Sequence, residues 1–346
     1  MSFASMSDSL SGLLPFYVFV ATAAWGLWGI FDKLALERSQ PKDVFLATTL
    51  FALPQIPLLL FMLYWSQPQW QLTPSLLIYA GLSSLVSSLG MMLYLDSMKR
   101  TDTTVILSLT AAYPLVTQIV CFFFLEETFS AGRALGAVFI ASGVVVIGLT
   151  DNSSPQPITN LPQPGKPEPS SNQESDPSFN HEPDPSSEQK PERLPVLRSA
   201  LRLFLRPGLG RLFLSAMVVN VCWGLKGVFE KLSVQHGTPL ESYFSECLTN
   251  LALLLPVLLW FFWSGFKPRL KSKHLWRYTG LSELALAVGG ISYLTALSLA
   301  PASYVVTITS TYPLLMYFIA LFVLNEKFNR IRLFGIVCIV VGGLIV

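Results

Sequence analysis

Charged residues are scarce in this sequence. They make up 13% of its 346 residues, whereas hydrophobic residues make up 52% and the mean hydropathy is +0.52. Soluble domains carry roughly 25% charged residues, so this composition excludes an ordinary soluble protein and places much of the chain in lipid. The net charge is only +2. This balance gives no argument for binding nucleic acid, and we expect no such partner.

Metal ligands and catalytic motifs are also lacking. The three histidines are scattered, and the four cysteines lie in apolar runs without a CxxC pair, so we expect buried free thiols and no zinc or haem site. The HExxH, GxSxG, Walker and GxGxxG signatures are absent. We therefore predict no enzyme and no cofactor. Without a phosphate-binding loop, the protein cannot itself hydrolyse ATP.

Long apolar runs, by contrast, are abundant. A membrane-spanning helix needs about 20 mostly apolar residues. The first run is too long for a signal peptide and has no basic residue ahead of it, so we expect it to be retained. The pattern predicts an all-α, polytopic protein with the lipid bilayer as its partner. Its ten predicted transmembrane helices lie near 14–36, 43–65, 75–96, 103–125, 131–150, 209–232, 242–263, 278–299, 303–324 and 330–346.

Residues 151–208 differ from the rest because they hold 12 of the 24 prolines and many polar residues. Such a segment cannot bury enough apolar surface to fold, so we predict a disordered linker between domains at 13–150 and 209–346. At its end, Arg198, Arg202 and Arg206 recur every four residues. This spacing predicts a basic amphipathic helix on an anionic leaflet, with a plain basic flank as the alternative.

The two apolar halves repeat each other. Trp25–Ala35 aligns with Trp223–Ser233 at an offset of 198, with seven of eleven positions identical. At an offset of 199, further pairs match, among them Tyr94 with Tyr293, Tyr113-Pro-Leu with Tyr312-Pro-Leu, Glu127 with Glu326, and Gly136 and Gly143 with Gly335 and Gly342. A steady offset indicates duplication. Because each half has five predicted spans, the second half must insert upside down, and inverted repeats place a site near the membrane midplane.

These motifs resemble the drug/metabolite transporter superfamily, and among its members the EamA-type ten-helix transporters. The resemblance rests on the tryptophan-glycine motif, the Tyr-Pro-Leu motif and the Leu-x-Glu-x-Phe motif, each in both halves. It implies a secondary transporter of small metabolites with a central cavity between the halves. The sequence departs from the pattern in its long linker and in Lys226, which stands where the first half has Trp28.

Basic residues indicate the orientation. Thirteen lie in or beside connections on the linker's side, against Arg133 and Lys231 on the other. The positive-inside rule therefore predicts a cytoplasmic linker and outside termini in the cell membrane. The family resemblance implies the reverse. The thirteen are Lys33, Arg38, Lys42, Lys99, Arg100, Lys267, Arg269, Lys271, Lys273, Arg277, Lys327, Arg330 and Arg332.

Charges inside spans are costly and usually face a cavity or a partner. Lys226 lies near the middle of its predicted span, which indicates either a cavity-lining role or an ion pair with Glu283 or Glu246. Asp32 and Glu230 are equivalent acids late in their spans. With Glu246 they are candidates for ion coupling, and the alternative for Asp32, Glu230 and the lysines that follow them is snorkelling to the interface.

Each Tyr-Pro-Leu motif predicts a distortion within its span. Pro114 and Pro313 cannot donate to the carbonyls of Thr110 and Thr309, which could then bind substrate at a hinge or be satisfied locally. Tyr113 and Tyr312 lie beside these prolines as candidate substrate contacts. Trp25, Trp28 and Trp223 could form a wall of the cavity, where they would contact substrate, or could simply pack against neighbouring helices.

Other repeated residues have structural interpretations. The paired glycines of the last spans predict close helix packing. Ser130 and Asn329 are predicted helix N-caps, and the acids Glu127 and Glu326 just before them are interpreted as structural.

Together these features predict a secondary transporter that moves a small polar or amphipathic metabolite by alternating access. A membrane-embedded sensor or scaffold that binds a partner through the linker is an alternative, and an intramembrane enzyme acting on lipid-linked substrates is a weaker one. The sequence leaves homodimer formation open.

Overall fold

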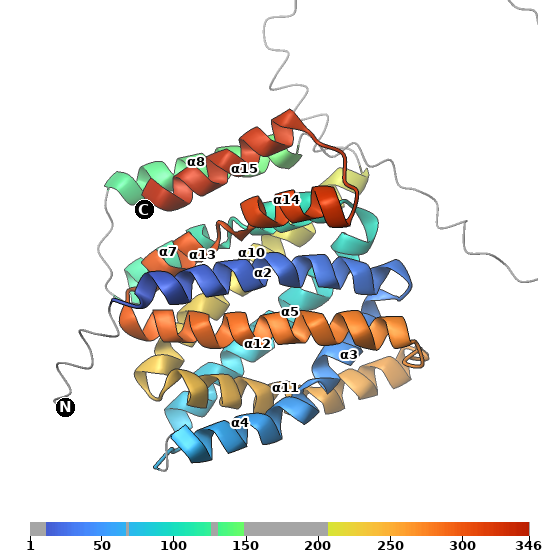
Figure 1. Cartoon of the computed structure of the whole chain (residues 1–346), viewed down its shortest axis with the longest axis vertical. Helices are drawn as coiled ribbons and strands as arrows, with labels where there is room; N and C mark the ends of the chain where they lie inside the picture. Colours follow the sequence, from blue (N-terminus) through green and yellow to red (C-terminus); the bar gives the residue numbers. More distant parts are fainter. Residues whose placement is uncertain (1–11, 67–68, 126–130, 149–206, 346) are drawn as a thin grey trace, which may run out of the picture.

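The computed structural model describes residues 12–66, 69–125, 131–148 and 207–345, and all regular secondary structure within them is helical. Most helices run roughly along one direction, as Figure 1 shows. In the first half they are α2 (Leu14–Glu37), α3 (Pro41–Leu50), α4 (Ala52–Ser66), α5 (Pro74–Arg100), α6 (Thr103–Thr110), α7 (Tyr113–Phe124) and α8 (Ala131–Gly148). In the second half they are α10 (Pro207–Gln235), α11 (Pro239–Trp263), α12 (Lys273–Leu299), α13 (Ala302–Thr309), α14 (Tyr312–Val323) and α15 (Arg330–Ile345).

Every apolar run that the sequence singled out is helical. Eight are long and apolar enough to cross a membrane, with α3 and α4, α6 and α7, and α13 and α14 each forming one broken span. The fifth run of each half is α8 or α15, with 18 and 16 residues. The fold is therefore all-helical and polytopic, as predicted, and its helices are compatible with ten spans.

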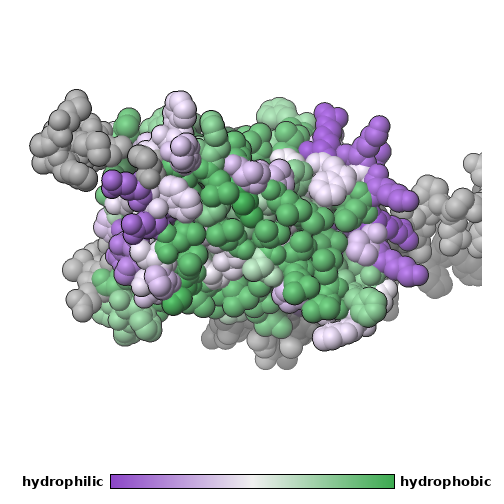
Figure 2. All heavy atoms as spheres, turned by 90° about the horizontal axis from the view of Figure 1, so that it is seen from below, coloured by the Kyte–Doolittle hydropathy of each residue, from purple (hydrophilic) through white to green (hydrophobic). Residues whose placement is uncertain are grey.

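The helices expose many large apolar side chains on their outer surface. On the face drawn in Figure 2, hydrophobic residues form a broad band between hydrophilic residues at either end. The equivalent residues Trp65 and Trp263 end α4 and α11 with 79% and 78% of their surface exposed. Exposed tryptophans are typical of the two membrane interfaces. The chain is thus a multi-pass membrane protein.

The two halves are related by inversion. Ser282 Oγ of α12 donates to Asp32 Oδ1 of α2 at 2.6 Å, and Gly289 of α12 lies against Trp25. The order of these contacts makes α2 and α12 antiparallel. Because α10 and α12 are first and third spans of one half, they run the same way. The first helices of the two halves, α2 and α10, therefore run in opposite directions, as predicted for inverted repeats.

Helices α8 and α15 pack closely through their glycines, as predicted. A Cβ on Gly143 would lie 2.4 Å from Gly335 O, and one on Gly342 would lie 2.6 Å from Gly136 O. Only residues without a side chain let two helix backbones approach this closely.

The membrane ends of the helices are capped by polar side chains. Asn329 Oδ1 accepts from Ile331 N at 2.9 Å and from Arg332 N at 3.2 Å, which confirms its predicted N-cap role. Glu326 is structural, as expected, but it acts at α6, where it accepts from Thr103 N at 3.0 Å and Thr104 Oγ1 at 2.5 Å. Ser130 and Glu127 lie outside the described residues.

The lysines that directly follow Asp32 and Glu230 cap the C-terminal ends of neighbouring helices. Lys33 Nζ donates to the carbonyls of Met98 and Thr101, both at 2.8 Å, at the end of α5. Lys231 Nζ donates to the equivalent carbonyls at the end of α12, at 2.6 and 2.9 Å. A lysine at a helix C-terminus satisfies carbonyls that have no partner within the helix. The snorkelling interpretation of these two lysines therefore needs correction.

The two prolines start new helices. The fourth and ninth spans break after Thr110 and Thr309, and Pro114 and Pro313 lie in the first turns of α7 and α14. Proline is tolerated there because the first N–H groups of a helix have no partner within it. The predicted distortions are thus full breaks rather than kinks. Residues 151–206 of the predicted linker, with the predicted basic helix that carries Arg198, Arg202 and Arg206, lie outside the described residues, whereas Pro207 and Gly208 already belong to α10.

Candidate functional site

A cavity of about 200 Å³ lies between the two halves. It is bordered by the middle of α2 and α10 and by parts of α3, α4, α5, α11 and α12, and the starts of α7 and α14 reach it through one tyrosine each. Its aromatic lining consists of Trp25, Trp28, Phe45, Tyr113, Trp223, Tyr243, Tyr293 and Tyr312. Its charged lining consists of Lys226, Glu230, Glu246 and Glu283. A concave apolar site with a few convergent polar groups is the usual form of a small-molecule site.

The aromatic walls are built twice by equivalent residues. The rings of Trp25 and Tyr293 lie 4.9 Å apart, and those of Trp223 and Tyr94 lie 5.3 Å apart. Trp25 and Tyr312 meet edge to face at 6.4 Å, as do Trp223 and Tyr113. Each contact joins one half to the other, so these rings pack the two halves together, and all of them except the fully buried Tyr94 also line the cavity.

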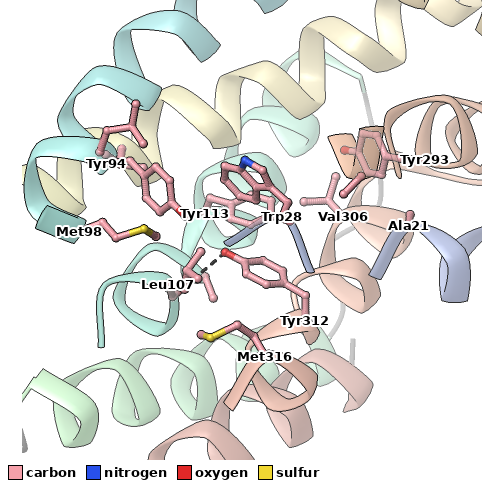
Figure 3. Close-up of a cluster of buried hydrophobic side chains, with 14 of the residues drawn as sticks. Ala21, Trp28, Tyr94, Met98, Leu107, Tyr113, Tyr293, Val306, Tyr312 and Met316 are labelled. Atoms are coloured by element: carbon pink, nitrogen blue, oxygen red, sulfur yellow. Dashed lines mark hydrogen bonds between the residues drawn. The ribbon is translucent and has the colours of Figure 1, made fainter. Parts of the chain in front are cut away.

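Trp28 completes this wall from the first half. Its ring stacks on Tyr94 at 5.0 Å and meets Trp223 edge to face at 5.6 Å. Figure 3 shows Trp28 with Tyr94, Tyr113 and Tyr312. The hydroxyl of Tyr312 donates to Leu107 O at 3.4 Å. Aromatic pairs at such separations hold their rings in defined orientations. The wall therefore holds its rings in defined orientations toward the cavity.

Lys226 is held by two carboxylates. Its ammonium forms a short contact with Glu230, one turn along α10, and lies 3.7 Å from Glu246 Oε2 of α11. Ser83 Oγ of α5 also donates to Glu246 Oε1 at 3.1 Å. The predicted ion pair of Lys226 with Glu246 is present. The contact with Glu230 was not anticipated, although the four-residue spacing places both side chains on one face of a helix.

Glu283 is held differently. Its Oε2 accepts a hydrogen bond from Gln55 Nε2 of α4 at 3.3 Å, and Cys247 Sγ of α11 lies 3.3 Å from Gln55 Oε1. Within the described part of the chain, no basic side chain forms an ion pair with Glu283. The predicted alternative of a pair between Lys226 and Glu283 is therefore not formed.

Asp32 lies behind the cavity wall. It is fully buried, one oxygen accepts from Ser282, and Oδ2 has no hydrogen-bond partner among the described residues. Glu230 is also nearly buried, with 3% of its surface exposed. Interfacial snorkelling does not fit either acid, because a snorkelling side chain keeps its charged end in water.

The cavity gathers most, but not all, of the predicted site residues. Thr110 and Thr309 are fully buried and do not line it. Their hydroxyls turn back onto their own helices, at 3.0 Å from Ile106 O and 2.8 Å from Val305 O. The helix break directs the following tyrosines to the cavity instead.

Several lining residues were not singled out from the sequence. Those with polar side chains are Thr48, Thr49, Gln55, Ser87, Ser88, Tyr243, Asn250 and Tyr293. Tyr293 carried a signal, because it matches Tyr94 in the repeat. Uncharged polar residues such as Gln55 carry no comparable signal, since such side chains in a span also serve as hydrogen-bonding contacts between packed helices.

Comparisons with known proteins agree with this architecture. The family model of the EamA-like transporter family matches residues 13–149 and again residues 211–346. A solved structure titled only "Crystal structure of protein" matches with a TM-score of 0.62 and 12% identity, covering 96% of each chain. At this identity the likeness shows the fold alone. No curated protein matches the sequence.

Proposed function

Because the chain belongs to the EamA-like transporter family, we propose that it is a secondary transporter which moves a small polar or amphipathic metabolite by alternating access. Members of this family are membrane transporters of small molecules rather than enzymes, and this supports the proposal. The observation that carries the finer proposal is the cavity of about 200 Å³ between the two inverted halves. Inverted repeats of this kind can rock against each other around a fixed central site.

Substrate contact is assigned to the rings and charges that face this cavity. Trp25, Trp28, Tyr113, Trp223 and Tyr312 supply apolar surface, and Lys226 and Glu283 supply charge. Pro114 and Pro313 are assigned as hinges, since each follows a break at which the two parts of a span can change their angle.

Coupling to an ion gradient is assigned to Asp32, Glu230 and Glu246. All three are buried acids close to the cavity, and Asp32 has an oxygen without a partner among the described residues. Intramembrane acids are commonly part of proton or ion pathways because their burial has a cost that only a partner or a function offsets.

We assign the protein to the cell membrane with the linker at 151–208 in the cytoplasm and both termini outside. The support is the excess of Lys and Arg in the short connections on the linker's side. A cysteine placed at Ser171 should be shielded from an impermeant thiol reagent in intact cells, and one at Ser5 should react. The reverse labelling would contradict this orientation.

Flux in liposomes tests the proposed function. Purified protein, reconstituted and screened against a mixed pool of metabolites, should move at least one compound that empty liposomes do not. Ser88→Trp should abolish that flux by filling the cavity, because Ser88 lines it. Leu89→Trp is the matched control, since the neighbouring Leu89 points outward with 58% of its surface exposed. Equal flux in both variants would exclude this cavity as the pathway.

A further inference from the structure

The charges that line the cavity do not balance. One ammonium group, that of Lys226, faces three carboxylates. Lys226 is already in contact with two of them, Glu230 and Glu246. The third, Glu283, has no cationic partner among the described residues. An anionic ligand would therefore approach a lysine that is already neutralised, beside an excess of negative charge.

Glu283 has acceptor capacity to spare. A carboxylate can accept about four hydrogen bonds, and the one bond found for Glu283 comes from the neutral amide of Gln55. Cys247 orients that amide, because its thiol Sγ donates to Gln55 Oε1 at 3.3 Å. The amide nitrogen of Gln55 therefore faces Glu283. A neutral hydrogen bond offsets only part of the cost of removing a carboxylate from water. A cation bound in the cavity would offset the remaining cost.

A second carboxyl group, that of Asp32, lies near Glu283. The adjacent residue in α12, Ser282, donates to Asp32 at 2.6 Å. Asp32 has no basic partner in the described residues either, because Lys33 beside it is bound to the carbonyls of α5. Two carboxyl groups without a basic partner thus lie on this side of the cavity, and a bound cation would stabilise their ionised forms.

Aromatic rings of α2 and α11 pack against α12 farther along the helix. Gly290 lies seven residues after Glu283, about 10 Å along the helix at 1.5 Å per residue. A Cβ on Gly290 would lie 2.9 Å from the Tyr243 ring, and one on Gly289 would lie 3.0 Å from Trp25. These rings therefore lie against α12 at this level, and they line the cavity. The site thus has an acidic end and an aromatic end.

Resting on the proposed function, we propose that the substrate is a small organic cation, an amine joined to one or two flat rings. Its ammonium group pairs with Glu283, and its ring lies against Trp25 and Tyr243. The rings also attract the cation, because their faces carry negative potential. The cavity of about 200 Å³ is below the roughly 300–1,000 Å³ of drug-sized pockets, which fits a ligand of this size.

Three indoles that differ only at the end of the side chain test this assignment. Tryptamine is a cation, tryptophol is neutral and 3-indolepropionate is an anion. Calorimetric titration of the full-length protein in nanodiscs should show tryptamine binding about 10-fold or more tighter than tryptophol, which corresponds to about 1.4 kcal/mol, with the anion weakest. Glu283→Gln should remove the preference for tryptamine and leave tryptophol binding unchanged. Glu37→Gln, at the exposed end of α2, should change neither.

The ligand series on the unmodified protein keeps the test decisive even if Glu283→Gln fails to fold. Equal binding of the three indoles, tightest binding of the anion, or binding of none would each overturn the proposal, as would unchanged tryptamine affinity in a folded Glu283→Gln protein. The proposed function fails separately. If liposomes show flux of a neutral or anionic compound but not of organic cations, and Ser88→Trp blocks that flux, the proposed transporter function stands and the organic-cation substrate is rejected. If tryptamine binds but no compound shows flux, the cation site stands and the transporter function is rejected.

Discussion

The two halves of the molecule use equivalent residues for support and different residues at the cavity. Lys33 and Lys231 bind equivalent carbonyls, and Trp25 and Trp223 each pack on a tyrosine of the opposite half. In the cavity this correspondence ends. The first half contributes no charged residue to the lining, and the second contributes all four.

The differences fall at a few equivalent positions. At an offset of 198, Trp28 corresponds to Lys226 and Thr48 to Glu246. At an offset of 199, Ser84 corresponds to Glu283. Capping and close helix packing constrain both halves alike because each half must bury its own backbone in lipid. The cavity needs only one set of charges to hold one ligand, so its two walls can differ. Substitutions at equivalent positions test this division.

The largest effect is expected at Lys226, where the halves differ most. Lys226→Met leaves Glu230 and Glu246 without their cation, and breaking a buried ion pair costs about 3–5 kcal/mol. We expect a lower thermal unfolding midpoint of the purified protein, partly restored in Lys226→Met with Glu230→Gln. An unchanged midpoint would show that the lysine is not held by these acids.

Effects at the α8–α15 contact should be equal in the two halves. The equivalent changes Gly143→Ala and Gly342→Ala place a Cβ 2.4 and 2.6 Å from a backbone oxygen of the facing helix, so each should cost about 1–3 kcal/mol through overpacking. Gly81→Ala is the control, because its Cβ would meet nothing closer than 3.6 Å. A large difference between the unfolding midpoints of the two variants would show that the two halves do not contribute equally to this contact.

Somewhat smaller losses are expected at the lysines that cap α5 and α12. Lys33→Met and Lys231→Met each remove two bonds from a charged donor to helix-end carbonyls. Because both lysines are partly exposed, we expect a cost of about 1.5 kcal/mol, the low end for bonds to charged groups. Thermal midpoints should fall together. A loss in only one variant would mean that only one half needs this support.

The smallest effects concern the acids at the starts of α3 and α11. Asp43 Oδ1 accepts from Arg269 N at 2.8 Å, and the equivalent Glu241 Oε1 accepts from Gln71 N at 2.9 Å, so each acid ties its helix to a connection of the other half. Asp43→Ala and Glu241→Ala should each cost about 1 kcal/mol, as for other helix caps. Asp96→Ala, on the surface, should leave the midpoint unchanged. Thermal unfolding of all three measures the difference.

Most of the scaffold could be predicted from the sequence, because lipid demands long apolar helices and the duplication relates them. The breaks were predictable in place but not in extent, since Pro114 and Pro313 mark the positions without fixing the angle between the two parts. Asn329 was predictable as a cap from its position before an apolar run.

The site could be predicted only in part. Charged residues inside spans are rare enough to attract attention, and Lys226, Glu246 and Glu283 do line the cavity. Aromatic residues are common throughout the spans, and the repeated Trp and Tyr-Pro-Leu motifs were needed to select those that line it. The partner of Glu283 was not predictable, because Gln55 reaches it only through the packing of α4 and α12 against a shared cavity. The pairing of Lys226 with Glu230 was visible in the four-residue spacing, but the spacing alone does not choose between a neighbour on the same helix and one on α11.

Alternating access of the cavity is the central claim, and a single cysteine tests it directly. Ser88→Cys would be placed in a protein whose four native cysteines are replaced by alanine and which retains flux. In oriented liposomes, an impermeant thiol reagent should label this cysteine from either side, with rates that a transported substrate changes in opposite directions. Leu89→Cys, which faces lipid, should stay unlabelled. Labelling of Ser88→Cys from one side only, unaffected by substrate, would contradict the account.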